Sequence, residues 1–509
     1  MLKKYALLFP LFFVVASNYL YAQNKDNASK REFRAVWIAT VKNIDWPSKP
    51  GLSTSKQQKE LVDILDAHQK NGINAIMFQI RPSADALYAK SEEPWASFIT
   101  GKQGVAPNPF YDPLDFVITE AHKRGMELHA WFNPYRATND LDEKSISEKH
   151  ITKTKPEWFF TYASKKYFNP ALPDVRTYIN KIVMNVVRSY DIDGVHFDDY
   201  FYPYPSKEPL PDSTSFAANN RGIKDINDWR RDNVDLLIKG IADSIRNSKN
   251  HVKFGISPFG IWRNLKEDPR GSDTNGLSGY SALYADVLKW TEKGWLDYVN
   301  PQVYFPFNYA PAAYEKLTDW WAKNSFGKHV YIGHGVYRLT EKKNGWEIPS
   351  QMPDQIQYLR KNNNIQGSIF FSSKSVTNNL GGFQDSLRTN LYKTIALPPT
   401  MAWLDHVPPS APLSLKFIKN NNSVILSWDK PYAVRDGETA YGYVIYRTSG
   451  KETLDINNPK NILKVIYGDV LTFVDNSVKK GRSYNYTITA IDRLKNESSQ
   501  ANQLQVIFD

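Results

Sequence analysis

The sequence predicts an α/β fold, a TIM (β/α)8 barrel, followed by an all-β sandwich of the immunoglobulin-like class. Over residues 31–396, eight short apolar segments alternate with amphipathic helical segments, which is typical of a barrel of parallel strands. Beyond a proline-rich stretch, apolar and polar residues alternate with a period of two, as in antiparallel strands. The 509 residues are 41% hydrophobic and 23% charged, which is the composition of globular domains and not of a disordered chain.

The barrel is expected to contain eight strands and eight helices. The strands are expected at 33–40, 73–80, 126–132, 194–198, 253–257, 298–305, 330–335 and 367–371. The helices are expected at 56–71, 113–124, 175–190, 226–247, 281–293, 311–323, 353–362 and 378–394. The first two helices end in typical stop signals, Asn71-Gly72 and Arg124-Gly125. A doubly wound open sheet is the alternative, but no glycine-rich phosphate-binding turn follows the first strand.

Residues 1–22 are predicted to be a cleaved secretory signal peptide. Lys3 and Lys4 form a basic start, residues 5–15 are almost continuously apolar, and the small residue Ala22 precedes a polar stretch. The apolar run is short for a membrane span, and no later segment has the roughly 18 uninterrupted apolar residues that a span requires. We therefore expect an exported protein, periplasmic or at the cell surface, with no transmembrane segment after signal cleavage.

Residues 397–412 are rich in proline and predict a semi-rigid linker. In residues 413–509, Trp428 ends one alternating segment, and another, 484–490, reads Tyr-Asn-Tyr-Thr-Ile-Thr-Ala. This part resembles the fibronectin type III family, in which a tryptophan on an early strand packs beneath a strand of that pattern. The resemblance implies a spacer or docking module without chemistry of its own, which could associate with the cell envelope.

The composition excludes several classes of site. The sequence has no cysteine, which rules out disulfides, thiolate metal sites and cysteine nucleophiles. The formal charge of +11 comes from scattered lysines and arginines without a recognised nucleic-acid motif, so we expect no nucleic-acid partner. Affinity for anionic cell-surface polymers would account for the charge, and a solvated lysine-rich surface accounts for it equally well.

Asp198 is the strongest candidate for catalysis. The active site of a TIM barrel lies at the C-terminal ends of the strands, and Asp198 ends the fourth predicted strand. Because side chains alternate along a strand, Val195 and Phe197 should face the helices, which sends His196 and Asp198 into the barrel. Such a carboxylate needs a partner, and Arg81 and Arg136 are the candidates. A purely structural carboxylate held by an arginine is the alternative.

The barrel resembles glycosyl-hydrolase-like family 10, a group of exported bacterial barrels. The motifs that carry the resemblance are Arg-Ala-Val-Trp at 34–37, Gln-Ile-Arg-Pro at 79–82, His-Ala-Trp-Phe-Asn-Pro at 129–134, Asp-Gly-Val-His-Phe-Asp-Asp-Tyr at 193–200, Leu-Tyr-Ala-Asp at 283–286 with Gly-Trp at 294–295, and Pro-Gln-Val-Tyr at 301–304. The resemblance implies hydrolysis of O-glycosidic bonds in a polysaccharide, such as peptidoglycan or another envelope glycan.

The fourth strand also resembles two more distant groups of barrels. In the α-amylase superfamily, Asp-Gly-x-x-x-Asp ends this strand with the nucleophile, which corresponds to Asp198. Chitinase-like barrels have a glutamate acid two residues later, where this chain has Tyr200. This difference argues against substrate-assisted chitinase chemistry and leaves the proton donor open. The candidates for it are Asp199, Asp45, Asp85 and Asp273.

We predict Asp198, as nucleophile or charge stabiliser, and Asp199, as its partner, to be the catalytic residues, without metal or cofactor. Asp199 could instead point toward the following loop. Histidines near the strand ends raise a metal-site hypothesis, but the chain has neither His-x-His near the first strand nor His-Glu-x-x-His. The residues predicted to bind and stack on sugars are Arg81, His129, Trp131, Asn133, His196, Tyr200, Trp262, Gln302, Tyr304 and His334.

Two other functions are compatible with the sequence. A non-catalytic glycan-binding protein on a degenerate hydrolase barrel would explain the missing glutamate. A hydrolase needs a second carboxylate placed opposite Asp198, whereas a binding protein does not. A metal-dependent deacetylase or amidohydrolase is the third hypothesis, and it would require a metal for activity.

Overall fold

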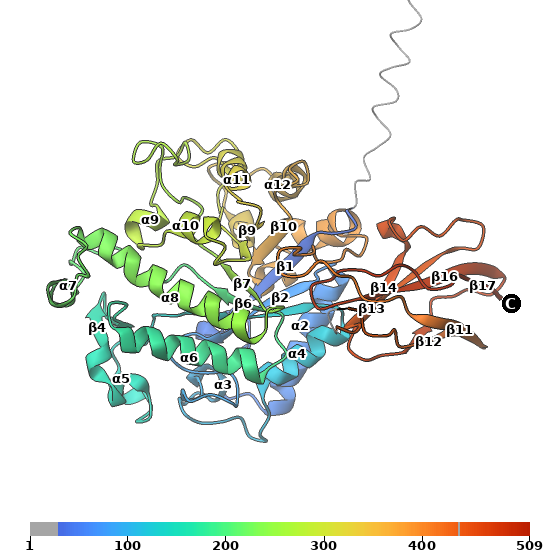
Figure 1. The fold of residues 1–509 in the computed structure, drawn as a ribbon, viewed down its shortest axis with the longest axis horizontal. Helices are drawn as coiled ribbons and strands as arrows, with labels where there is room; N and C mark the ends of the chain where they lie inside the picture. The colour runs from blue at the N-terminus through green and yellow to red at the C-terminus, as the bar shows by residue number, and fades with distance from the viewer. Residues whose placement is uncertain (1–28, 436–437) are drawn as a thin grey trace, which may run out of the picture.

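The computed structural model describes residues 29–435 and 438–509, so the predicted signal peptide lies outside the described residues. Eight parallel strands close into a barrel in the order β1-β10-β9-β8-β7-β6-β3-β2, which confirms the predicted TIM barrel (Figure 1). The barrel strands are β1 (Phe33–Ile38), β2 (Ala75–Arg81), β3 (Glu127–Phe132), β6 (Gly194–Phe197), β7 (Lys253–Ile256), β8 (Tyr298–Val299), β9 (His329–Gly335) and β10 (Gly367–Phe371). A small hairpin, β4 (Phe159–Tyr162) and β5 (Lys165–Phe168), lies in the β3–β6 connection.

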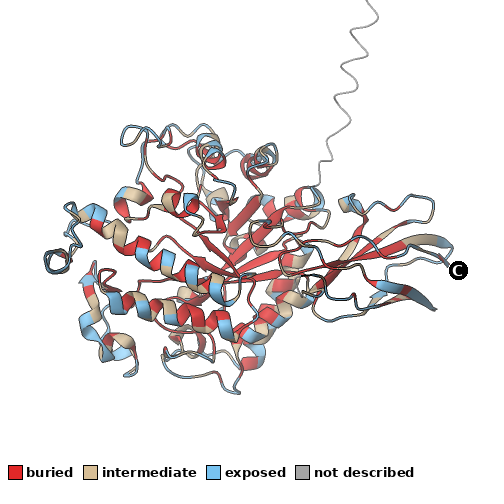
Figure 2. Cartoon of the chain, in the orientation of Figure 1, coloured by how far each residue is buried: buried red, intermediate tan, exposed pale blue. Residues whose placement is uncertain are grey.

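The helices around the barrel begin and end close to the predicted positions. They include α2 (Thr54–Lys70), α4 (Pro113–Lys123), α6 (Pro173–Ser189), α8 (Ile226–Ser248), α11 (Tyr314–Lys323) and α12 (Gln351–Leu359). Each has one buried face against the strands and one exposed face, as the alternating colours in Figure 2 show. Side-chain caps define some starts: Asp112 accepts hydrogen bonds from the first backbone N–H groups of α4, and Asp225 does so for α8.

Three predicted elements are interrupted. The strand expected at 298–305 is limited to Tyr298–Val299, because prolines at 301 and 306 cannot donate ladder hydrogen bonds. The helix expected at 281–293 is split into α9 (Gly279–Ala282) and α10 (Val287–Glu292), with the Asp286 side chain capping the second part. The helix expected at 378–394 is broken into the short turn η5 (Leu380–Gly382), which contains two glycines with positive φ, followed by α14 (Phe383–Ser386) and the π-helical turn η6 (Leu387–Leu391).

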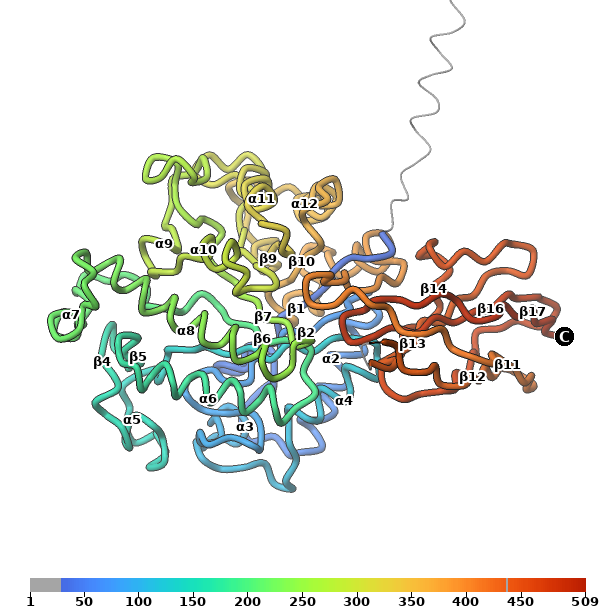
Figure 3. The backbone as a smooth tube through the Cα atoms, in the orientation of Figure 1, coloured from blue at the N-terminus to red at the C-terminus, as the bar shows by residue number. Residues whose placement is uncertain are grey.

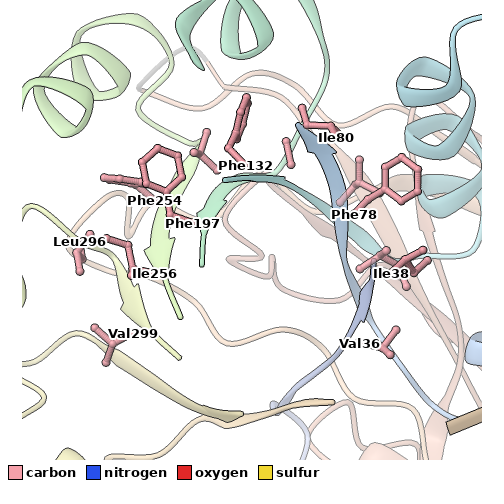
Figure 4. Close-up of a cluster of buried hydrophobic side chains, with 14 of the residues drawn as sticks. Val36, Ile38, Phe78, Ile80, Phe132, Phe197, Phe254, Ile256, Leu296 and Val299 are labelled. Carbon is pink, nitrogen blue, oxygen red and sulfur yellow. The ribbon is translucent and has the colours of Figure 1, made fainter. Parts of the chain in front are cut away.

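The barrel has an apolar outer layer and a more polar interior. Outward side chains pack between the strands and the helices, as Figure 4 shows for Val36, Phe78 and Phe197 among others. Val195 and Phe197 belong to this layer, whereas His196 and Asp198 point inward, as alternation predicts. The interior is narrow, because a Cβ built on Gly255 would lie 2.1 Å from the Tyr298 ring. Glycine at this position therefore leaves the space that Tyr298 occupies.

The C-terminal domain is an antiparallel sandwich of seven strands. One sheet contains β11 (Leu413–Asn420), β12 (Ser423–Asp429) and β15 (Thr472–Asp475). The other has the order β14 (Ile462–Tyr467), β13 (Gly442–Ser449), β16 (Arg482–Ile491) and β17 (Leu504–Phe508). Trp428 is buried between the sheets beside Tyr443, and Tyr486, Ile488 and Ala490 belong to the same core. The all-β prediction is confirmed, and membership of the fibronectin type III family stays a prediction.

The segment 397–412 packs against the barrel and does not act as the spacer that its prolines suggested. Leu397 pairs with the backbone at Arg31, and Met401 is fully buried in the barrel interior, beside the starts of the strands. The Trp403 indole donates a hydrogen bond of 3.1 Å to Asp297 Oδ1. The sandwich therefore sits directly on the barrel, where β14 packs against the end of α4 (Figures 1 and 3).

Lys495, from the loop after β16, enters this contact with its side chain completely buried. Its ammonium lies 3.3 Å from Glu127 Oε1 and 3.5 Å from Asp193 Oδ1 of the barrel. The rings of Tyr441 and Tyr467 cover it, with centroids at 5.0 and 4.5 Å. Glu127 also binds Lys253 at 2.5 Å. Both residues lie at the starts of their strands, the end of the barrel that we call the barrel floor. Two cations from two domains therefore neutralise the carboxylates at the barrel floor.

We predict that Lys495→Met lowers the free energy of unfolding by about 3 kcal/mol, because it leaves buried carboxylate charge without compensation. Chemical denaturation followed by tryptophan fluorescence measures the change. Lys419→Met is the control, since Lys419 is a partly exposed lysine of the same domain, 3.4 Å from Asp509. It should change stability by less than about 0.5 kcal/mol. Equal losses in both variants would contradict the assigned role of Lys495.

Candidate active site

A cavity of about 270 Å³ opens where the barrel strands end, at the position predicted for an active site. Its lining residues are Trp37, Ala39, Val41, Ile44, Gln79, Trp131, Arg136, Asp198, Asp199, Tyr200, Tyr204, Ser257, Gln302, Tyr304, Tyr337 and Phe371. A larger cavity of about 390 Å³ lies at the opposite end, beside the starts of β1 and β10. TIM-barrel chemistry is built from the C-terminal ends of the strands, so the smaller cavity is the candidate active site.

Asp198 lies at the bottom of this cavity and is almost completely buried. Its Oδ2 accepts hydrogen bonds from the Trp131 indole at 3.0 Å and from the Asn133 amide at 3.2 Å, both from the β3 side. Its Oδ1 has only a long contact of 3.3 Å with the backbone N–H of Tyr200. Oδ1 is therefore the oxygen that can carry a proton toward a substrate.

Asp199 is the second carboxylate of the cavity. Gln302 Nε2 donates to its Oδ1 at 3.0 Å, and the Tyr204 hydroxyl donates to its Oδ2. Tyr204 stacks on Tyr200, with ring centroids 5.0 Å apart, and the Arg136 guanidinium lies 4.9 Å from the Tyr200 ring. Both oxygens of Asp199 thus accept a hydrogen bond, which favours the ionised form relative to an equally buried carboxylate without donors.

The environment raises the pKa of both carboxyl groups. Burial raises the pKa of Asp198 to about 7, and the negative charge of Asp199 adds to the shift. Burial also raises the pKa of Asp199, which the hydrogen bonds from Tyr204 and Gln302 oppose. Near neutral pH the pair therefore holds one proton, located mainly on Asp198, and one negative charge, located mainly on Asp199.

A hydrogen-bonded axis runs from the cavity to the barrel floor. Trp37 Nε1 donates to His196 Nε2 at 3.0 Å, and His196 Nδ1 and His129 Nδ1 flank the Tyr298 hydroxyl at 3.0 and 2.9 Å. His129 Nε2 lies 3.1 Å from Glu127. An indole N–H only donates and a carboxylate only accepts, so the direction of each hydrogen bond in this axis is fixed. His196 Nδ1 donates to the Tyr298 hydroxyl, which donates to His129 Nδ1, and His129 Nε2 donates to Glu127. Burial lowers the pKa of both histidines, and they remain neutral.

Six of the predicted sugar-binding residues surround the cavity. Trp131, Tyr200, Gln302 and Tyr304 line it directly. Asn133 and His196 are fully buried behind the wall, where Asn133 binds Asp198 and His196 binds Trp37. From these positions, Asn133 and His196 can orient the side chains that line the cavity, but they cannot contact a sugar directly.

Four other predicted residues lie away from the cavity. Arg81 forms a two-pronged ion pair with Glu93 at 2.6 and 2.7 Å, and it does not partner Asp198. His129 is part of the buried axis. Trp262 stacks on Trp320 and donates to Asp286, and His334 is enclosed by Gln355 and Ser368. All four are buried with their polar atoms engaged, so we correct their predicted role from sugar contact to structural support.

The remaining candidates for the proton donor are also engaged elsewhere. Asp45 accepts hydrogen bonds from the Ala39 and Lys374 backbones and from the Ser372 hydroxyl. Asp85 binds Ser83 and Gln103, and Asp273 forms an exposed ion pair with Lys316. Within the described part of the chain, Asp198 and Asp199 are the carboxylates that line the cavity.

Several cavity residues were not among the predicted site residues. Trp37, Tyr204, Tyr337 and Phe371 add aromatic surface. Arg136, a predicted candidate partner of Asp198, also lines the cavity and adds the cation. Trp37, Tyr337 and Phe371 follow from the strand-end rule, since they lie on or just after β1, β9 and β10. Tyr204 lies in a long loop, where no periodic signal indicates which side chain returns to the cavity.

Among the described residues, one cluster of three carboxylates has its oxygens close enough together to hold a cation. Oxygens of Asp405, Glu438 and Asp492 lie within 4.8 Å of one another, at the junction of the linker and the C-terminal domain. Asn496 donates hydrogen bonds to Asp405 and Asp492 there. The cavity itself offers the two aspartates and no lining histidine, which is a poor donor set for the metals of hydrolytic enzymes.

The family model and two named relatives agree on the family of the barrel. Residues 32–347 match the model of the family described as glycosyl hydrolase-like 10. The chain is 43% identical over 485 residues to glycosyl hydrolase YngK of Bacillus subtilis, covering 93% of each chain. It is 38% identical over 367 residues to glycosyl hydrolase DigH of Escherichia coli K12, covering 67% of this chain and 83% of the relative. The PgaB glycoside hydrolase domain of Bordetella bronchiseptica has a TM-score of 0.46 at 12% identity, covering 70% of this chain and 98% of that domain.

We predict that Asp198→Asn stabilises the fold more at pH 8 than at pH 4.5. The folded-state pKa of Asp198 is raised, so its contribution to stability is complete below the unfolded pKa and is lost as pH rises toward 7. At about 1.4 kcal/mol per pKa unit, the gain of the variant should grow by roughly 2–3 kcal/mol between the two pH values. Urea denaturation measures it, with Asp115→Asn on the exposed face of α4 as the surface control. A gain independent of pH would contradict the assignment.

Proposed function

The chain belongs to the glycosyl hydrolase-like 10 family, and we propose that it hydrolyses O-glycosidic bonds of a bacterial envelope polysaccharide, such as peptidoglycan. The observation that carries the proposal is the pair of buried carboxyl groups, Asp198 and Asp199, in an aromatic cavity at the C-terminal end of the barrel. Glycoside hydrolysis requires one group that protonates the leaving oxygen and one charge that stabilises the oxocarbenium-like transition state. A pair that holds one proton and one negative charge supplies both.

Asp198 takes the role of general acid. Its pKa near 7 keeps a proton on the group at neutral pH, and the proton sits on the oxygen without strong donors. The ionised Asp199, oriented by Gln302 and Tyr204, stabilises positive charge at the anomeric centre. This assignment differs from the role as nucleophile expected by analogy with amylases, because burial favours the protonated form of Asp198.

The aromatic walls suit a sugar ring. Trp37, Trp131, Tyr304 and Tyr337 present flat apolar faces around the two carboxyl groups. Sugar C–H groups pack on such faces, while Gln79 and Arg136 offer donors for hydroxyl groups at the rim. The cavity requires no metal for this chemistry.

The proposed place of action is the cell envelope, either the periplasm or the cell surface. Residues 1–22 have the features of a secretory signal. The net charge is +11, and without Lys3 and Lys4 of the signal it is +9, which favours association with anionic envelope polymers. Each helix in the described ranges is too short or too polar to cross a bilayer. The C-terminal sandwich, which also packs on the barrel, would assist association with the envelope.

Incubation of the mature protein with purified peptidoglycan and a panel of polysaccharides tests this function. We expect new reducing ends and defined fragments by mass spectrometry with the wild type. Asp198→Asn and Asp199→Asn should lower the rate by about 10²–10⁴-fold, the usual contribution of an acid–base group. Co-sedimentation with a glycan without cleavage by any of the three proteins would instead support a binding protein. Loss of cleavage in chelator would favour a metal-dependent reaction.

Leaving groups of different acidity test the assignment within the pair. We expect Asp198→Asn to lose activity on glycosides with poor leaving groups. On dinitrophenyl glycosides, which need no protonation, it should retain most of its kcat/KM, which reports the bond-breaking step. Asp199→Asn should lose activity on both, since its charge stabilises the anomeric centre in either case. The two variants are matched controls for each other, and the reverse pattern would assign the acid to Asp199.

A further inference from the structure

The two carboxyl groups of the cavity approach a substrate from one side. Both follow β6, and in the closed strand order the strand diametrically opposite is β10. Phe371 of β10, with Trp37 of the neighbouring β1, forms that opposite wall. Hydrolysis by two enzyme carboxylates needs them on either side of the scissile bond, roughly 5–9.5 Å apart. Among the described lining residues, no carboxylate faces Asp198 and Asp199 across the cavity.

Asp45 is a carboxylate that is bound at the ends of β1 and β10, the strands of the opposite wall. It lies beside β1 and β10, but its two oxygens accept three hydrogen bonds, from Ala39, Ser372 and Lys374, and it does not line the cavity. An attacking carboxylate needs an oxygen directed at the anomeric carbon. Asp45 is therefore placed to hold the β1 and β10 loops together and not to act as a nucleophile.

The side chains of Asp198 and Asp199 point in different directions, although the two residues are neighbours in the chain. Asp198 is held toward β3 by Trp131 and Asn133. Asp199 is held toward the end of β8 by Gln302. The pair can thus contact two adjacent points of one sugar residue from the same side, such as the glycosidic oxygen at C1 and a substituent at C2.

We propose that the nucleophile is the substrate's own 2-acetamido group, so that the enzyme cleaves β-linked 2-acetamido-2-deoxyhexosides by neighbouring-group participation. This inference rests on the proposed function and specifies its substrate class and its chemical course. The absence of the chitinase glutamate at position 200 counts against participation of the chitinase kind, in which that glutamate is the acid. Here Asp198 is the acid and Asp199 is the partner of the acetamido group. Participation requires the acetamido group and the leaving group on opposite faces of the ring, which the β-gluco and β-galacto configurations provide.

The reaction then proceeds in two balanced steps. In the first, Asp198 transfers its proton to the glycosidic oxygen as the C1–O bond breaks, and the acetamido carbonyl oxygen bonds to C1. The resulting oxazolinium ion keeps its N–H, which donates a hydrogen bond to ionised Asp199. In the second, Asp198 takes a proton from water while the water oxygen bonds to C1 and the C1–carbonyl bond breaks. One water is consumed, both carboxyl groups regain their initial states, and the anomeric configuration is retained.

The cavity offers what an acetamido group needs. Its aromatic wall, formed by Trp37, Trp131 and Phe371, can enclose the methyl group, and Asp199 can accept from the amide N–H. The Ser257 hydroxyl also lines the cavity and is buried without a hydrogen-bond partner among the described residues. A buried hydroxyl without a partner is unfavourable in the empty site and gains one when a polar substrate binds.

A series of fluorogenic β-glycosides that differ only at C2 tests the proposal with the wild-type protein. The probes are methylumbelliferyl glycosides of β-1,4-linked disaccharides that carry N-acetyl, N-fluoroacetyl, N-trifluoroacetyl or hydroxyl groups at C2 of the reacting sugar, in gluco and galacto forms. Fluorine withdraws electrons from the carbonyl oxygen and weakens it as a nucleophile. We expect kcat to fall progressively, by about 100-fold for trifluoroacetyl, or ~2.7 kcal/mol of barrier, and the hydroxyl probe to be inert.

The outcomes separate this inference from the proposed function. Equal rates across the series, or faster cleavage of the hydroxyl probe, would overturn participation while leaving glycoside hydrolysis intact. Cleavage of none of these probes, together with no cleavage of any polysaccharide, would overturn both.

Covalent trapping gives a second, independent measurement. Incubation with 2-deoxy-2-fluoro glycosyl fluorides labels an enzyme carboxylate that acts as a nucleophile, and peptide mass spectrometry locates the adduct. We expect no adduct, together with retention of configuration by NMR and inhibition by an N-acetylglucosamine-derived thiazoline that mimics the oxazolinium ion. An adduct on Asp45, Asp198 or Asp199 would show that the enzyme supplies the nucleophile, and would overturn the proposal.

Discussion

The buried charge of Glu127 at the barrel floor is the constraint on which much of this structure depends. A carboxylate removed from water is costly unless cations are close to it, and here Lys253 comes from the barrel and Lys495 from the C-terminal domain. Because one of these two lysines comes from the sandwich, the sandwich completes the charge compensation of the barrel. The linker follows the same surface, with Met401 and Trp403 packed beside the strand starts. The two domains therefore form one structural unit, despite the proline-rich connection.

The same carboxylate also fixes the direction of the hydrogen bonds in the barrel interior. Because Glu127 is ionised, His129 must donate to it, and each later group in the axis has a defined donor and acceptor. The axis ends on the Trp37 indole, which lines the cavity. Neutral histidines with a single tautomer give a rigid interior, and such rigidity holds an aromatic wall in place for a substrate. Floor and cavity are thus linked through one uninterrupted set of side chains.

The chemistry of the cavity depends on incomplete compensation of charge. At the barrel floor, Glu127 and Asp193 each have a cation within ion-pair distance. In the cavity, the side chains that donate to Asp198 are the neutral Trp131 and Asn133. The Arg136 guanidinium stacks on Tyr200 and does not pair with Asp198. Full pairing would lower the pKa of Asp198 and remove its proton at neutral pH. The fold therefore places its strong ion pairs at the barrel floor and leaves Asp198 and Asp199 dependent on hydrogen bonds. Raised pKa values at buried, cavity-lining carboxyl groups are typical of functional sites.

The local pattern of apolar and polar residues in the sequence predicted the barrel, the sandwich and the ends of the strands. It also predicted that His196 and Asp198 point inward. The periods of strands and helices can be recognised in this way because they depend on neighbouring residues alone. It also predicted that Asp198 and Asp199 lie at the end of the barrel where the cavity opens, since that end follows from chain direction. Tertiary structure alone decided that Arg81 pairs with Glu93, that Trp262 and His334 lie away from the cavity, and that Tyr204 lines it. It also decided that Lys495 closes the barrel floor. These contacts join residues far apart in sequence, and which partner a buried side chain meets depends on the packing of the whole fold.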